Sequence, residues 1–196
     1  MKKQPEVTAA TRQGFIDAFW TLYKEKGIEK ISVSEITKIS GNNRSTFYHY
    51  FLDVYDLLEQ IEDKLLEDVN RDLKSAFGCV ADEISSSDDF NILFSRITPV
   101  FRKYEEKLFV LIGSHGDPKF SGLLRKHMKE NLLAFQVLPS DTEHIDYIIN
   151  FIYSSIIGML GFWYEREHDI SEEEFIKLVP NLTAYGVLGY RKGVNL

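Results

Sequence analysis

A short run of polar and aromatic residues, GNNRSTFYHYF at positions 41–51, carries the side chains best suited to recognising another molecule. Arginine can pair with guanine and asparagine with adenine through two hydrogen bonds each, while hydroxyl groups can hold phosphate oxygens. This set on one helix therefore points to DNA binding. The candidate contact residues in the run are Asn42, Asn43, Arg44, Ser45, Thr46, Tyr48, His49 and Tyr50.

Two helices must position these side chains. The tetrapeptide Ser32-Val33-Ser34-Glu35 has the spacing of a capping box, which predicts a helix beginning at residue 33. We expect Val33, Ile36 and Ile39 to form its buried face. Residues 40–43 break this helix, and helix resumes through Phe47 and Phe51.

The second helix has an inward and an outward face. Phe47 and Phe51 are four residues apart and should face the core together. Residues 48–50 should then occupy the exposed arc. With a preceding helix from about Thr8 to Lys26, the pattern predicts a helix-turn-helix unit whose second helix enters the major groove. The alternative is a surface loop whose aromatic residues are core or partner contacts.

Charge is distributed unevenly along the chain. The 196-residue chain has a net charge of −7, which by itself disfavours a nucleic-acid partner. However, residues 1–52 hold eight Lys/Arg against five Asp/Glu, a balance of +3, so that the remainder carries −10. A basic head on an acidic body is typical of a modular DNA-binding protein.

The rest of the chain also shows helical periodicity. Asp53 can cap a long fourth helix, and ISSSD at positions 84–88 predicts a loop. We expect a fifth helix through Pro99, a separate short helix over residues 108–112, and a helix from Pro118 to about residue 137. Two further S-x-x-E boxes, at residues 140–143 and 171–174, predict helices over 141–166 and from 172 to about 190.

One segment, Tyr147 to Tyr164, has 18 residues without a charge. Its length makes it a marginal membrane span, but polar residues dilute it and both flanks are acidic. We therefore expect a buried helix and no membrane. Paired glycines suggest close packing between this helix and the last one, at a dimer interface. The expected interface residues are Gly158, Gly161, Phe175, Leu178, Val179, Leu182, Gly186 and Gly189.

An apolar effector pocket is expected among the inner helices of the body, because ligand pockets are lined mainly by aromatic and apolar side chains. The candidates are Phe94, Phe101, Tyr104, Phe109, His115, Phe135, Tyr147, Phe151, Tyr153 and Trp163, most of which we expect to be core.

The spacing of the candidate catalytic residues does not support an enzyme. Residues 114–117, SHGD, contain the letters of a hydrolase triad, but neighbours in one loop cannot point at one another in that geometry. Histidines are scattered and no phosphate-binding loop occurs, so we expect no catalysis, no metal and no cofactor. A single cysteine and the absence of a secretory signal at the start indicate a cytoplasmic location.

The run ISVSEITKISGNNRSTFYHYFLDVYDLL, residues 31–58, resembles the DNA-binding signature of the TetR family of transcriptional regulators. The resemblance implies a homodimer on a palindromic double-stranded DNA operator and a C-terminal domain that binds a small-molecule effector. It also implies phosphate contacts by Ser32 and Ser34. The family usually has a lysine at the start of the fourth helix, whereas this sequence reads Leu52-Asp53-Val54-Tyr55, which puts one backbone contact in doubt.

These observations lead to an all-α fold of about nine helices. Residues 1–52 are predicted to form the helix-turn-helix DNA-binding domain and residues 53–196 the larger helical domain for effector binding and dimerisation. The predicted function is ligand-responsive transcriptional regulation, most simply repression. The missing lysine keeps a second interpretation open, a TetR-like co-regulator that acts through protein partners with weak or no DNA binding of its own.

Overall fold

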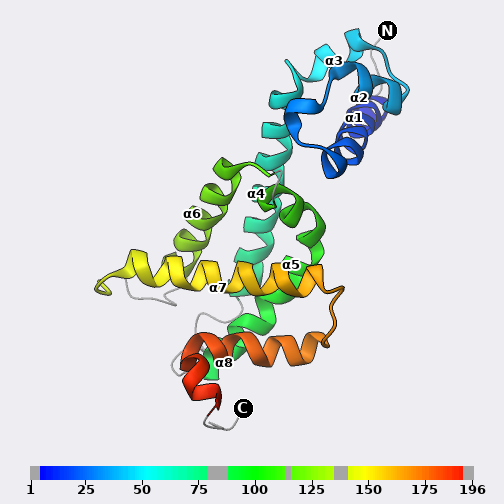
Figure 1. Ribbon diagram of the computed structural model, residues 1–196. Coiled ribbons are helices and arrows are strands. Elements are labelled where there is room, and N and C mark those ends of the chain that lie inside the picture. Colours follow the sequence, from blue (N-terminus) through cyan, green and yellow to red (C-terminus); the bar gives the residue numbers. More distant parts are fainter. Residues whose placement is uncertain (1–4, 79–87, 114–115, 135–140, 192–196) are drawn as a thin grey trace. The chain divides into compact units, whose positions relative to one another are not determined.

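The computed structural model describes residues 5–78, 88–113, 116–134 and 141–191, and every regular element in these ranges is a helix (Figure 1). The all-α class and the expected number of about nine helices are confirmed for this part of the chain. In chain order the helices are α1 (Pro5–Glu25), the 3₁₀ helix η1 (Ile28–Lys30), α2 (Val33–Ser40), α3 (Arg44–Tyr50), α4 (Val54–Gly78), α5 (Asp88–Ile112), α6 (Pro118–Ala134), α7 (Ile145–Glu165) and α8 (Glu172–Arg191).

The chain divides into two compact units. The first consists of Met1–Glu67 with Val110–Phe120, and the second of Asp68–Phe109 with Ser121–Leu196. The first unit therefore holds α1, α2 and α3 together with the beginning of α4. The predicted domain boundary after residue 52 stays a prediction.

Aromatic side chains form the core of the first unit. Phe15 of α1 and Phe47 of α3 are fully buried, and their rings meet edge to face with centroids 5.4 Å apart. Phe51 is 1% exposed and lies 6.3 Å from Phe15 and 5.3 Å from Phe47. Each aromatic pair of this kind adds about 0.5–1.5 kcal/mol beyond area burial. The expected inward direction of Phe47 and Phe51 is thus confirmed, and it fixes α3 on α1.

Helix α2 begins with the predicted capping box. Ser32 Oγ accepts from the Glu35 backbone N–H at 3.4 Å, and Glu35 Oε2 accepts from the Ser32 N–H at 3.0 Å. Lys26 Nζ also lies 2.6 Å from Glu35 Oε1. The bond from Lys26, followed by those from Ser32, lowers the pKa of Glu35 to about 2. The start of α2 is therefore fixed both by its own cap and by the end of α1.

One expectation for α2 is wrong. Ile39 was expected to be buried, but its side chain is 50% exposed. The buried residues of α2 are Ile36 and Thr37. Ile39 lies two residues beyond Thr37, which is roughly 200° further round the helix and away from the core.

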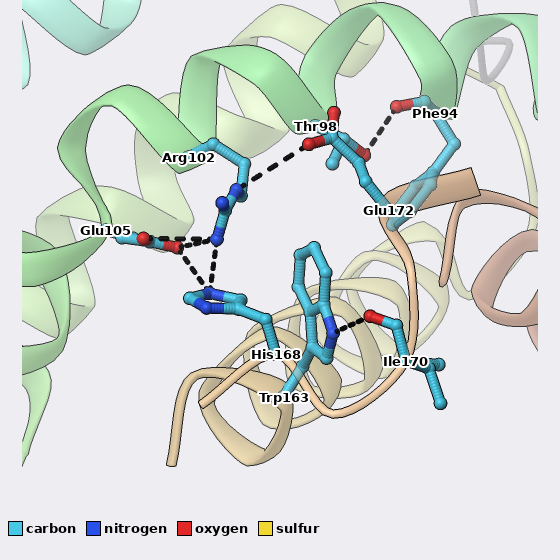
Figure 2. Close-up of polar contacts among 8 residues, drawn as sticks. All are labelled: Phe94, Thr98, Arg102, Glu105, Trp163, His168, Ile170 and Glu172. Carbon is cyan, nitrogen blue, oxygen red and sulfur yellow. Dashed lines mark hydrogen bonds and ion pairs between the residues drawn. The ribbon is translucent and has the colours of Figure 1, made fainter. Parts of the chain in front are cut away.

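The second unit is built around Trp163 of α7. Its ring stacks on Phe175 of α8 at 4.2 Å between centroids, and its indole N–H donates to the Ile170 carbonyl at 2.9 Å. Phe94 of α5 lies 6.2 Å from Phe175. Figure 2 shows the Trp163 indole directed at Ile170, in the segment that leads into α8.

A polar cluster extends this core (Figure 2). The Arg102 guanidinium lies over the Trp163 ring at 5.0 Å and pairs with Glu105 at 3.0 Å and with Glu172 at 3.7 Å. His168, in the turn after α7, contacts both Arg102 and Glu105. These contacts hold the turn between α7 and α8 against α5.

Helix α5 runs without interruption from Asp88 to Ile112, so the separate short helix predicted over residues 108–112 is wrong. Pro99 lies inside it. Proline removes one backbone hydrogen bond, but the apolar stripe continues on both sides, with Phe94, Ile97 and Leu108 buried. Thr98 Oγ1 also donates to the Phe94 carbonyl at 2.8 Å, beside the interrupted bond.

The predicted start is confirmed for α8 but is wrong for α7. Helix α8 begins with the predicted box, since Ser171 Oγ accepts from the Glu174 N–H at 3.2 Å. Helix α7 does not begin at residue 141. It begins at Ile145 after His144, whose φ of 58° is left-handed and whose side chain makes no cap bond. Glu143 instead contacts His144 at 3.1 Å, and Ser140 lies outside the described residues.

Candidate nucleic-acid interface and C-terminal region

The turn between α2 and α3 sets the direction of the candidate recognition helix. Gly41 ends α2 in the left-handed conformation, with φ 68° and ψ 15°, and its N–H donates to the Thr37 carbonyl. Glycine adopts this conformation without the steric cost that a side chain brings. Asn42 Nδ2 then donates to the Ser40 carbonyl at 2.9 Å, which closes the turn.

Asn43 is the N-cap of α3. Its Oδ1 accepts from the Thr46 backbone N–H, from Ser45 Oγ and from Thr46 Oγ1, each at 2.8 Å. Replacing such a cap by alanine typically costs about 1 kcal/mol. Asn43 is a predicted base or groove contact, and the structure adds a local structural role for its oxygen.

The outward face of α3 carries most of the predicted contact residues. Arg44, Ser45 and His49 are exposed, and Tyr48 is 57% exposed. Phe47 of the same helix is, by contrast, fully buried. The exposed residues supply the donors and acceptors that base edges require, on a helix that Phe47 fixes against α1.

Tyr50 does not belong to this exposed arc, so that expectation is wrong. Its side chain is half-buried, and its hydroxyl donates to the Thr8 carbonyl of α1 at 3.2 Å. Its ring also lies 6.3 Å from that of Phe15. Tyr50 follows Phe47 by three residues, which brings it back to the inner side of the helix.

Ser32 and Ser34 are both exposed at the start of α2. The Ser32 hydroxyl is already engaged in the capping box, where it donates to Glu35 Oε2 at 2.8 Å. The backbone N–H groups at this helix terminus are a suitable site for a phosphate. Their contact with DNA stays a prediction.

The link between α3 and α4 contains residues that sequence reasoning did not assign to the site. Leu52 is 81% exposed and Tyr55 is 59% exposed. Asp53 Oδ1 accepts from the Asp56 N–H at 2.9 Å, so the predicted cap of α4 is confirmed. Asp56 Oδ2 in turn accepts from the Leu52 N–H at 2.7 Å. An acidic, capped link thus stands where a lysine was expected.

The predicted pocket residues fall into several environments. Phe94, Phe101, Tyr153 and Trp163 are buried core. The Tyr104 hydroxyl donates to Asp72 at 2.7 Å, and Phe109 stacks on Tyr164 at 5.2 Å. Tyr147 and Phe151, at 80% and 56% exposed, do not face inward, so their placement in a pocket is wrong. His115 and Phe135 lie outside the described residues.

The predicted interface residues also separate. Phe175 and Val179 are each 1% exposed within the chain, which makes them core residues rather than surface that a second chain could meet. Leu178, Leu182 and Gly186 are half-buried, and the surroundings of Gly189 are not described.

The glycines of α7 and α8 are explained differently. A side chain at Gly158 would meet nothing within 4 Å, whereas one at Gly161 would contact Phe109 at 3.4 Å. Gly186 has φ 66° and ψ 176° and produces a kink in α8. A side chain at 161 would thus make an ordinary van der Waals contact, whereas the backbone conformation at 186 is one that glycine adopts without strain.

Helix α7 leaves an apolar face exposed. Tyr147, Phe151 and Phe162 (57% exposed) recur on that face, and on α8 Tyr185 and Val187 are 40% and 73% exposed. By length and composition, α7 is the one helix in the described part of the chain that could cross a membrane, and 28% of its most apolar window is buried. Exposed apolar faces of this kind commonly mark association sites.

A three-helix unit with an exposed recognition helix, followed by a larger helical unit, is the architecture of a helix-turn-helix transcriptional regulator. The chain belongs to the TetR family. Residues 15–61 match the family model described as "Bacterial regulatory proteins, tetR family". Residues 88–185 match "Transcriptional regulator C-terminal region".

Solved structures agree with this fold. A TetR transcriptional regulator from Streptococcus agalactiae 2603V is similar with a TM-score of 0.62 and 20% identity, over 91% of this chain and 96% of that one. The fatty acid degradation regulator FadR from Bacillus halodurans has a TM-score of 0.62 and 17% identity, over 95% and 98% of the two chains. No curated protein matches this sequence.

Proposed function

We propose that this protein is a transcriptional repressor that binds a palindromic operator as a homodimer and responds to a small-molecule effector. The observation that carries the proposal is the division of α3 into two faces. Phe47 is fully buried against α1, while Arg44, Tyr48 and His49 are exposed. A recognition helix needs a buried face that fixes it on its domain and an exposed polar face, because its side chains have to reach base edges in a fixed register.

The body supports the other half of the proposal. The exposed apolar face of α7 and α8 is a suitable surface for a second copy of the chain, since homodimers bury more apolar area than other interfaces. We place the DNA-binding domain at residues 1–52 and effector binding and dimerisation at residues 53–196. The effector would be a small apolar or aromatic molecule, and the protein would act in the cytoplasm without catalytic activity.

Fluorescence anisotropy tests DNA binding directly. A labelled duplex from upstream of the protein's own gene is titrated at two salt concentrations with nonspecific competitor DNA. We expect Arg44→Ala or His49→Ala to weaken specific binding by about 1–3 kcal/mol while the circular dichroism spectrum stays helical. Lys74→Ala is the matched control, because it removes one exposed positive charge in the second unit. If no specific site were found anywhere in the genome, the proposal would be wrong.

A second candidate function is a co-regulator that reaches DNA through a protein partner. It is favoured by the acidic link between α3 and α4, where Asp53 and Asp56 cap backbone N–H groups beside the recognition helix. Carboxylates there repel a phosphate backbone. This function predicts no specific DNA binding by the purified protein and recovery of binding when the partner is added.

A further inference from the structure

A cavity of about 400 Å³ in the first unit lies between the beginning of α4 and the residues that lead into α6. The α4 side contributes Leu58, Glu59 and Glu62, and the α6 side contributes Asp117 and Lys119. It is distinct from the predicted effector pocket in the second unit. Its size falls within the range of about 300–1,000 Å³ usual for small-molecule sites.

The lining of this cavity is strongly acidic. It contains five carboxylates and one amine. Most of these carboxylates have partners close by. Glu59 pairs with Lys119 Nζ at 3.1 Å, and Asp117 Oδ1 accepts from the Lys119 backbone N–H at 2.7 Å. Asp53 and Asp56 accept from backbone N–H groups of the link.

Glu62 is different. Its side chain is 3% exposed, and within the described ranges its Oε1 is buried without a hydrogen-bond partner. Burial first, and then the nearby charge of Asp117, raises the pKa of Glu62 to about 7, against a weaker opposing effect of Lys119. The pKa of Tyr23 of α1 is raised to about 12 by burial first, and then by the nearby charges of Glu62 and Asp117. Buried carboxyls are normally paired, because the unpaired charge is costly.

The chemistry of the lining favours one kind of ligand. Among the described residues, no group of three His, Cys, Asp or Glu side chains is placed to hold a metal ion. An organic cation needs fewer carboxylates and also needs an apolar wall. Leu52 and Tyr55, at 81% and 59% exposed, provide that wall at the mouth of the cavity, and a tyrosine ring can attract a cation.

We propose that this cavity binds an organic ammonium ion that carries a compact apolar or aromatic group. The ammonium donates to Glu62 and is attracted by Asp117, while the apolar group lies against Tyr55 and Leu52. Operator binding is not needed for this site, so each can fail without the other.

Isothermal titration calorimetry with 2-phenylethylamine tests the proposal. Glu62 is about half protonated near pH 7, and an ammonium beside it favours the ionised form, so binding should release up to about half a proton. The release is measured as a difference in apparent enthalpy between phosphate and HEPES buffers at this pH. The neutral 2-phenylethanol should bind at least about 10-fold more weakly, because it lacks the charge.

Variants assign the effect to Glu62. Glu62→Gln should weaken amine binding by about 10-fold or more and abolish the proton release. Asp117→Asn, which keeps an oxygen for the Lys119 N–H, should weaken binding less. Glu59→Gln is the control at the exposed rim and should retain proton release. Absence of amine binding at millimolar concentration, equal binding of the alcohol, or unchanged binding by folded Glu62→Gln would each overturn the proposal.

Discussion

Replacing Phe47 by leucine tests whether the inner face of α3 holds the recognition helix in place. Phe47 is fully buried, with ring centroids 5.4 Å from Phe15 and 5.3 Å from Phe51. Leucine keeps most of the apolar volume but loses the ring contacts with Phe15 and Phe51, each worth about 0.5–1.5 kcal/mol. With a further small packing loss, we expect the first unit to lose about 2 kcal/mol of its free energy of unfolding.

Urea denaturation can measure this change in the first unit separately. The two tryptophans, Trp20 and Trp163, lie in different units, so a Trp163→Phe background leaves Trp20 to report on the first. A unit of this size has a denaturant slope of about 1 kcal/mol per molar urea. The Phe47→Leu midpoint should therefore fall by about 2 M.

Tyr48→Ala in the same background is the matched control. Tyr48 is the next residue on α3 but is 57% exposed. Its removal should shift the midpoint by less than about 0.5 M, because exposed substitutions usually change stability little, while operator affinity falls. Equal midpoint shifts for the two variants would refute the division of α3 into a packing face and a reading face.

Three other perturbations follow from the structure. Ser32→Ala removes the cap of α2 and should lower the free energy of unfolding of the first unit by about 1 kcal/mol, measured by urea denaturation with Ser34→Ala as the control. The pKa of Glu62 is raised from 4.5 to about 7, so the folded state keeps the proton longer than the unfolded state does. The contribution of this group to the free energy of unfolding should be largest below about pH 4.5 and fall by up to about 3 kcal/mol as the pH rises through 7. If the pH dependence of the free energy of unfolding were the same in Glu62→Gln as in the wild type, this prediction would be contradicted. Phe162→Glu places a charge on the exposed apolar face of α7 and should shift a dimer to monomer in light scattering, whereas an unchanged mass would place the interface elsewhere.

The head of the molecule could be predicted closely because its signals are local. The Ser32–Glu35 box, the turn at Gly41 and the Phe47–Phe51 pair each depend on residues within four positions of one another. Helix caps and left-handed turns follow from such short-range geometry. Tyr50 was misplaced because its environment depends on α1, 42 residues away along the chain.

The body was less predictable because its patterns do not specify which partner covers a face. Phe175 and Val179 repeat at helical spacing, as either core or interface residues would, and packing against Trp163 decides for the core. Residues 140–143 have the residue types of a capping box, but the helix begins only at Ile145. The separate helix predicted over residues 108–112 is instead the end of α5, whose buried stripe continues past Pro99 as expected.

The cap of α3 also determines the hydrogen-bond polarity that the first turn presents to DNA. A hydroxyl has one proton, and the Ser45 and Thr46 hydroxyls both direct theirs to Asn43 Oδ1, which can only accept. The lone pairs of Ser45 and Thr46 stay available to accept hydrogen bonds. Without breaking the cap, these two oxygens can meet the amino groups of cytosine or adenine, but not a phosphate oxygen, which needs a donor.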